Sequence, residues 1–177
     1  MVKIFTRKAT RETFRQKALP HLDSIYRMAV RTCSDPVLAQ DLTQDTFKEA
    51  WNSFHRYEPD SNCKAWLFTI FFRLSNRYRH KQYRTQSIAL EEIPESSLSV
   101  GPKIEDEMDG KLALEVLESL PDHYKAVLAL ADVEGLSYRE IGESLQLPTG
   151  TVMSRLNRAR KLLRERFMGR TGRSETA

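Results

Sequence analysis

Apolar residues recur at helical spacing along most of the chain. Leu67, Ile70 and Leu74 follow the i, i+3, i+7 pattern of a helix with one buried face. A similar apolar stripe runs from Leu22 to Val30. Runs in which apolar and polar residues alternate, which would indicate strands, are nearly absent. The pattern therefore predicts an all-α protein.

Residues that begin and end helices are placed consistently with this pattern. Asp35 is well placed to cap a helix whose first residue is Pro36, an arrangement that starts helices cleanly. The four residues from Ser137 to Glu140 have the sequence of a capping box. Gly135 is well placed to end the helix before them.

One stretch breaks the helical pattern. Residues 85–104 are rich in Ser, Pro, Gly and Glu and show no periodicity, which favours a linker. We therefore expect two small helical domains, residues 1–84 and residues 105–177, joined by a flexible linker at 85–104. The second domain carries a basic tail.

Charge is distributed unevenly over the 177 residues, although the net charge is only +4. Basic residues crowd the segment from Arg155 to Arg173, whereas the segment from Glu91 to Asp109 is mostly acidic. Such asymmetry indicates a polyanionic partner at particular faces of the molecule.

Several other classes of protein are disfavoured. No apolar run approaches the length of a membrane span and the N-terminus lacks the features of a signal peptide, so we expect a cytoplasmic protein without membrane insertion. Cys33 and Cys63 lie far apart, which indicates neither a disulfide framework nor a zinc site. They are expected to be reduced thiols, and a redox role is the alternative.

Catalytic chemistry also finds little support. The four histidines lie on separate segments, and neither a Ser/His/Asp or Cys/His arrangement nor a Gly-rich phosphate loop is evident. We therefore expect a protein that is not an enzyme and has no cofactor, no metal and no small-molecule substrate.

The segment from Ser137 onward predicts a helix-turn-helix. Short polar side chains near the start of its second helix, followed by arginines, suit reading of the major groove. Thr149 and Gly150 would present backbone N–H groups to a phosphate at the helix start. The outward-facing residues are Thr151, Ser154, Arg155, Asn157, Arg158 and Lys161. The alternative is a solvated basic helix that only packs against its neighbours.

Two motifs in this order resemble a known family. The segment at 117–163, LESLPDHYKAVLALADVEGLSYREIGESLQLPTGTVMSRLNRARKLL, resembles region 4 of bacterial RNA polymerase sigma factors of the extracytoplasmic-function (ECF) type. SDPVLAQDLTQDTFKEAW and CKAWLFTIFFRLSNRYR, at 34–51 and 63–79, resemble region 2. The resemblance implies a subunit that binds core RNA polymerase, recognises the −35 and −10 elements of promoter DNA and assists melting. The alternative is a free-standing helix-turn-helix regulator that senses a ligand.

The resemblance also implies roles for particular residues. The residues that match the family's polymerase-binding helix are Asp41, Leu42, Gln44, Asp45 and Phe47. The carboxylates of Asp41 and Asp45 lie one helical turn apart and so share a face of the helix. Such a pair can also belong to a solvated face that binds nothing.

Recognition of the −10 element as a single strand requires aromatic stacking and positive charge. The matching residues are Tyr57, Asn62, Arg73, Asn76, Arg77, Tyr78 and Arg79. Tyr57 matches a position that is usually aromatic, in the loop that holds a flipped base, and Asn62 is expected to bond a base edge. Trp66 is expected to lie in the core.

The chain departs from the family at two positions. Arg73 stands where relatives often carry Asn, and Met153 stands where many carry an arginine that contacts a base. Both changes are expected to alter the preferred promoter sequence. The resemblance also implies an anti-sigma factor as a partner.

Overall fold

The structure is a computed structural model that describes residues 7–33, 35–86, 117 and 119–174, and every regular element in these ranges is helical. The chain divides into two compact units, Met1–Ser97 and Leu98–Ala177. The all-α fold predicted from the sequence is confirmed. The predicted linker at 85–104 lies outside the described residues except for its first two, which extend the last helix of the first unit.

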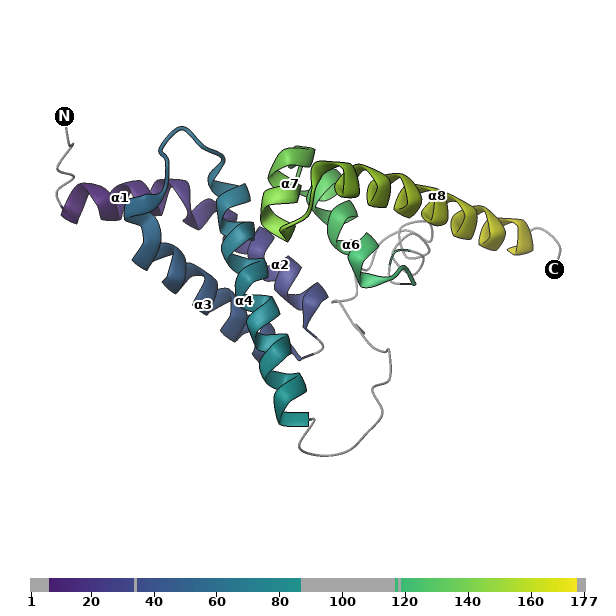
Figure 1. Cartoon of the computed structure of the whole chain (residues 1–177), viewed down its shortest axis with the longest axis horizontal. Coiled ribbons are helices and arrows are strands. Elements are labelled where there is room, and N and C mark those ends of the chain that lie inside the picture. The colour runs from purple at the N-terminus through teal and green to yellow at the C-terminus, as the bar shows by residue number, and fades with distance from the viewer. Residues whose placement is uncertain (1–6, 34, 87–116, 118, 175–177) are drawn as a thin grey trace. The chain divides into compact units, whose positions relative to one another are not determined.

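Four α-helices build the described part of the first unit (Figure 1). They are α1 (Arg7–Lys17), α2 (Leu22–Thr32), α3 (Pro36–Ser53) and α4 (Cys63–Gln86), with short 3₁₀ segments at Leu19–His21 and Phe54–Arg56. The predicted start of α3 is confirmed, because the Asp35 carboxylate accepts a hydrogen bond from the Val37 N–H at 2.8 Å. A cap of this kind contributes about 1 kcal/mol.

The core of this unit lies where α2, α3 and α4 pack together. Phe68 and Phe71 on α4 are fully buried, as is Ile25 on α2. Burying one such side chain stabilises the fold by roughly 1.5–3 kcal/mol. Two residues of the predicted α2 stripe, Leu22 and Tyr26, remain 44% and 37% exposed because they border the groove between α2 and α3.

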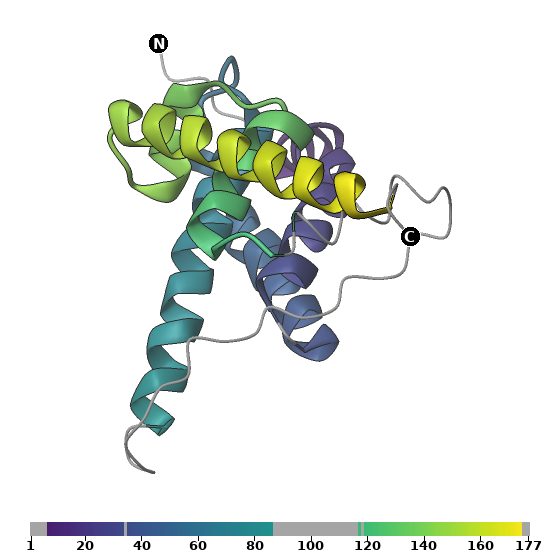
Figure 2. The same cartoon turned by 90° about the vertical axis from the view of Figure 1, so that its right-hand side faces the viewer.

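The second unit contains α6 (Asp122–Leu128), a single π-helical turn (Ala129–Val133), α7 (Tyr138–Leu145) and α8 (Thr149–Ser174). Helices α6 and α7 both pack against α8, and α7 lies near the start of α8 (Figures 1 and 2). The start of the predicted second domain, residues 105–116 and 118, lies outside the described residues.

Buried apolar residues from the three helices and the segments between them form the core of this unit. They include Val127, Leu128, Leu130, Leu136, Ile141, Val152, Leu156 and Ala159. The Glu134 N–H donates to the Ala129 carbonyl at 2.9 Å, which closes the wide π turn. Gly135 follows at φ +70°, a conformation that glycine adopts readily, and it ends the helix as predicted.

Candidate nucleic-acid interface

The capping box at the start of α7 is present as predicted. The Ser137 hydroxyl accepts a hydrogen bond from the Glu140 N–H at 3.3 Å, and the Glu140 carboxylate accepts one from the Ser137 N–H at 2.7 Å. These reciprocal bonds satisfy backbone donors that have no partner within the helix. They fix the residue at which the first helix of the pair begins.

A tight turn joins α7 to α8. Gln146 takes the left-handed conformation at φ 56°, and the Leu147 N–H donates to the Gly142 carbonyl at 2.8 Å. A Cβ atom at Gly142 would lie 2.7 Å from the Leu147 carbonyl oxygen. The close backbone approach therefore requires glycine at this position, a requirement that helical periodicity alone does not reveal.

Helix α8 presents a polar and basic face opposite its buried side. Val152, Leu156 and Ala159 are buried, so the intervening positions point outward. Seven predicted DNA-contacting residues are exposed, namely Thr149, Gly150, Met153, Ser154, Asn157, Arg158 and Lys161. Thr151 and Arg155 are half-buried, and Met153 is 48% exposed. The helix therefore brings the predicted −35 residues onto one surface, while the roles given to them stay a prediction.

The loop before α4 is held by aromatic packing. The Tyr57 ring stacks on Phe54 with centroids 5.3 Å apart and lies 5.1 Å from the Trp66 ring. The Tyr57 hydroxyl donates to the Ser61 carbonyl at 2.7 Å. Only 8% of Tyr57 is exposed, so in this conformation it supports the loop from inside. Trp66 belongs to the same cluster and is half-buried.

Asn62 begins α4. Its side-chain carbonyl accepts hydrogen bonds from the Lys64 and Ala65 N–H groups at 3.1 and 3.4 Å. The predicted base-contacting amide is thus held at the helix start, and its side chain is exposed. The cap fixes where the side chain lies relative to the loop.

Two side chains of α3 contact α4. The Tyr78 hydroxyl donates to the Asp45 carboxylate at 2.6 Å, and Arg73 bonds Glu49 with Nη2 and Oε1 3.1 Å apart. The hydrogen bond to Asp45, together with burial, raises the pKa of Tyr78 to about 12. A residue predicted to bind polymerase therefore contacts one predicted to bind the −10 strand. Sequence reasoning missed Glu49, whose only signal is its position one turn after Asp45.

The other predicted −10 residues lie on the same helix. Asn76, Arg77 and Arg79 are all exposed on α4. The Arg79 guanidinium donates to the Asn76 side chain at 2.6 Å. Together with Arg73, they give this stretch of α4 a concentrated positive charge suited to a phosphate backbone.

The residues predicted to bind polymerase divide by burial. Asp41 and Gln44 on α3 are exposed, and Phe47 is half-buried. Leu42 is only 1% exposed and packs in the core. In this conformation Asp41, Gln44 and part of Phe47 are accessible to a partner. Leu42 instead packs α3 against the core of the unit.

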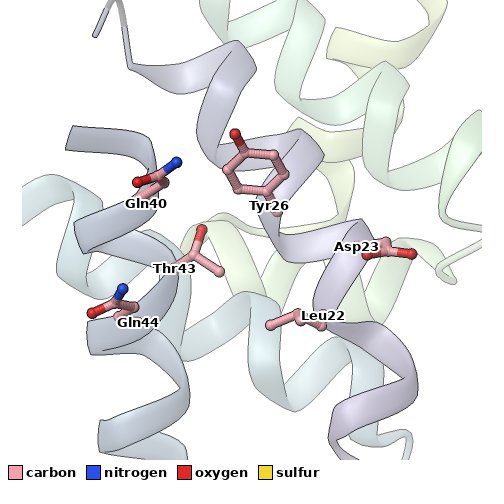
Figure 3. Close-up of a pocket in the computed structure, with 6 residues that line it drawn as sticks. All are labelled: Leu22, Asp23, Tyr26, Gln40, Thr43 and Gln44. Carbon is pink, nitrogen blue, oxygen red and sulfur yellow. The ribbon is translucent and has the colours of Figure 1, made fainter. Parts of the chain in front are cut away.

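A shallow pocket adjoins this face (Figure 3). Its volume is about 200 Å³, and it lies between α2 and α3. The lining residues are Leu22, Asp23, Tyr26, Gln40, Thr43 and Gln44. Gln44 thus belongs both to the predicted polymerase-binding face and to the pocket wall. The volume is below the roughly 300–1,000 Å³ of typical small-molecule sites.

The two cysteines are both thiols in this structure. Burial raises the pKa of Cys63 to about 11, despite the opposing effects of the Tyr57 hydrogen bond and the Lys17 charge. Burial also raises the pKa of Cys33. Among the described residues, no cluster of His, Cys, Asp and Glu side chains is suited to hold a metal ion. No helix in that part of the chain is long and apolar enough to cross a membrane.

Comparison with known families matches both units. The model of Sigma-70 region 2 matches residues 19–85, and that of Sigma-70 region 4 matches residues 111–163. These segments contain the two candidate surfaces described above.

Individual relatives agree with these matches. The chain is 30% identical to the RNA polymerase sigma factor CarQ of Myxococcus xanthus over 90% of this chain and 91% of CarQ. It is 27% identical to the ECF sigma factor SigW of Bacillus subtilis over 91% of this chain and 92% of SigW. It is also 36% identical to the ECF sigma factor SigE of Mycolicibacterium smegmatis over 82% of this chain, but spans only 58% of that relative.

Solved structures show the same similarity. The sigma factor RpoE, in complex with the anti-sigma factor NepR from Bartonella quintana, matches with a TM-score of 0.69 and 29% identity. The match covers 89% of this chain and 98% of that one. CnrH, in complex with the cytosolic domain of CnrY, matches in fold with a TM-score of 0.57 at 21% identity.

Proposed function

Because this chain belongs to the ECF sigma factors of bacterial RNA polymerase, we propose that it binds core polymerase and directs transcription from its own set of promoters. The single observation that carries this proposal is the presence of both sigma regions in one chain, each with an exposed polar or basic face. Members of this family are transcription initiation factors that perform no catalysis themselves. Its polymerase works in the cytoplasm, where we place the action of this protein.

The second unit is proposed to read the −35 element. Helix α8 would enter the major groove with Ser154, Asn157 and Arg158 toward the base edges. The start of the helix would hold a phosphate at Thr149 and Gly150. Support for this role comes from the exposed polar face of α8 and from the fixed turn that precedes it.

The first unit is proposed to hold the −10 element as a single strand and to dock on polymerase. The basic stretch of α4 would follow the phosphates, while the loop held by Tyr57 and Asn62 would receive a base. Asp41 and Gln44 on α3 would meet polymerase. We propose that residues 1–84 act in this part of the promoter, residues 105–177 act at −35, and residues 85–104 connect them.

An anti-sigma factor is proposed as a further partner. The solved structure of RpoE contains one, the NepR protein. The exposed apolar residues Leu22 and Tyr26 would suit a helix of such a partner. Such a partner would compete with polymerase if it covered the face at Gln44.

Run-off transcription tests the proposed function. Purified core polymerase is given a library of genomic fragments, with and without this protein. New transcripts whose templates share spaced −35 and −10 elements are expected. If no polymerase-dependent product forms and the protein instead binds free duplex as a symmetric dimer, a helix-turn-helix regulator replaces the sigma factor as the interpretation.

A further inference from the structure

Arg73 is the predicted −10 residue that departs from the usual pattern of the family, and it has an acidic neighbour on another helix. The carboxylate of Glu49 on α3 lies 3.1 Å from the Arg73 guanidinium on α4. The two side chains are 49% and 35% exposed, so nucleic acid could reach both.

The geometry of the pair leaves Arg73 able to make further contacts. A single distance, from Nη2 of Arg73 to Oε1 of Glu49, defines the contact, whereas a fork-shaped pair would use two parallel bonds. The guanidinium has five N–H donors, and the contact with Glu49 uses the Nη2 group alone. The carboxylate thus fixes one side of the group and leaves the other side available to a ligand.

The position of Glu49 is fixed by the packing of the two helices. Helices α3 and α4 pack against each other, and the Tyr78–Asp45 bond of 2.6 Å joins them one turn away. The Ser53 hydroxyl also donates to the Glu49 backbone carbonyl at 2.7 Å. The backbone of Glu49 is therefore held beside α4, where its carboxylate reaches Arg73.

We propose that Glu49 is a positioning residue that makes Arg73 selective for a base of the −10 strand. An arginine without a carboxylate beside it can bind any phosphate, and such a contact gives affinity without sequence preference. A neighbouring carboxylate repels phosphates but does not repel the neutral acceptor atoms of a base edge. Glu49 therefore lowers non-specific binding by Arg73 and turns the guanidinium toward a base. This inference rests on the proposed function.

Four variants separate this role from simple structural support. Glu49→Gln keeps the size and the acceptor oxygen but removes the charge, and Glu49→Asp keeps the charge on a shorter side chain. Arg73→Ala, and the double variant that combines Glu49→Gln with Arg73→Ala, complete a double-mutant cycle. Glu143→Gln in the second unit is the matched control, because it removes the same charge from an exposed ion pair with Arg139.

The first measurement is transcription by the reconstituted holoenzyme from a promoter library with randomised −10 positions. Glu49→Gln should reduce discrimination at one −10 position by about 1.5-fold to fivefold, the range expected for an exposed ion pair. Glu49→Asp should restore part of the preference. The double variant should behave like Arg73→Ala, because Glu49 acts through Arg73.

The second measurement needs no polymerase. Binding of the full chain to a fluorescent oligothymidylate is followed between about 50 and 200 mM salt. Glu49→Gln should bind more tightly than the wild type and with a steeper dependence on salt, and Glu143→Gln should not. A purely structural role for Glu49 would leave the salt dependence unchanged.

The outcomes are distinct. If the wild type yields no polymerase-dependent transcripts, the proposed function fails and this inference fails with it. If the wild type is active but Glu49→Gln keeps the wild-type −10 preference, only the role of Glu49 is overturned. An effect of Glu49→Gln that persists in the Arg73→Ala background also overturns it.

Discussion

At the scale of single residues, burial determines which groups can react or bind. Cys63 is 7% exposed and belongs to the packed start of α4, whereas Arg158 is exposed on α8. The Cys63 thiol is therefore held in a form that reacts slowly, while the Arg158 guanidinium is available to a ligand.

Cys63 should react slowly with thiol reagents. Burial raises its pKa from 9.0 to about 11, so below pH 9 the thiolate is about a hundredfold scarcer than for an ordinary cysteine. In a Cys33→Ser background, alkylation by iodoacetamide followed by mass spectrometry should be slower than that of free cysteine by at least this factor. A rate equal to that of free cysteine would contradict the burial and favour a redox role.

The same pKa shift affects stability at alkaline pH. Because the folded-state pKa of Cys63 exceeds the unfolded value, its stabilising contribution is present below about pH 9 and is lost as pH rises toward 11. Urea unfolding should therefore show a smaller alkaline loss of stability for Cys63→Ala than for the wild type.

Replacing Arg158 should weaken recognition of a −35 site. If the side chain reads a base, Arg158→Ala should cost about 1–3 kcal/mol on the preferred sequence and reduce preference at one position. Arg158→Lys separates the two kinds of contact, because lysine keeps the charge but cannot form the bidentate pair. Binding to duplex −35 variants, measured by fluorescence anisotropy with holoenzyme, checks this. An equal loss on every sequence would indicate a phosphate contact.

At the scale of elements, the turn between α7 and α8 sets the angle at which the exposed face of α8 is presented. The capping box begins α7, and the left-handed Gln146 ends it. The hydrogen bond from Leu147 to Gly142 then closes the turn. Because no side chain fits at Gly142, the fold of this helix pair depends on one close approach between backbone atoms.

Substitution at Gly142 should therefore destabilise the second unit. In Gly142→Ala the new methyl group would lie 2.7 Å from a backbone oxygen, so the turn must shift, at a cost of about 1–3 kcal/mol. Gly150→Ala is the matched control, because nothing lies within 4 Å of its Cβ position, and it should be neutral or slightly stabilising. Thermal unfolding followed by circular dichroism measures both. Equal unfolding midpoints for the two variants would contradict the predicted clash.

At the scale of the whole molecule, two units with separate cores carry different proposed tasks. Unit Met1–Ser97 contains the proposed polymerase-binding face and the proposed −10 surface, and unit Leu98–Ala177 contains the proposed −35 surface. Within the first unit, Tyr78 on α4 donates a hydrogen bond to Asp45 on α3. This contact places the proposed polymerase-binding face next to the proposed −10 surface.

Association with core polymerase should depend on the exposed residues of α3. Asp41→Ala combined with Gln44→Ala should weaken binding by at least about 1 kcal/mol, roughly fivefold, with little effect on unfolding because both side chains are exposed. Asp45 is left intact because it also bonds Tyr78. Glu12→Ala on α1 is the control. Unchanged affinity of the double variant, measured by competition for core polymerase, would remove this face from the interface.

The first unit should fold without the second. A fragment ending at residue 104 should unfold cooperatively with the helical signal of α1 to α4, because its buried residues pack within the unit. Circular dichroism and urea titration test this. A fragment without a cooperative transition would show that both units share one core.

The sequence by itself determined the helical class, the caps at Asp35 and Ser137, the end of a helix at Gly135 and the family. These features depend on residues within a few positions of one another or on motifs that occupy continuous segments. They can be predicted because capping and periodicity are local properties of a helix.

Only the tertiary structure decided which side chains meet across helices. The pairs Tyr78–Asp45 and Arg73–Glu49 join residues 33 and 24 positions apart, and the register of α3 against α4 sets them. The same packing buries Leu42, which the family motif places beside exposed residues. The sequence predicted the helices, but contacts between them depend on how whole faces pack, and no local pattern encodes that register.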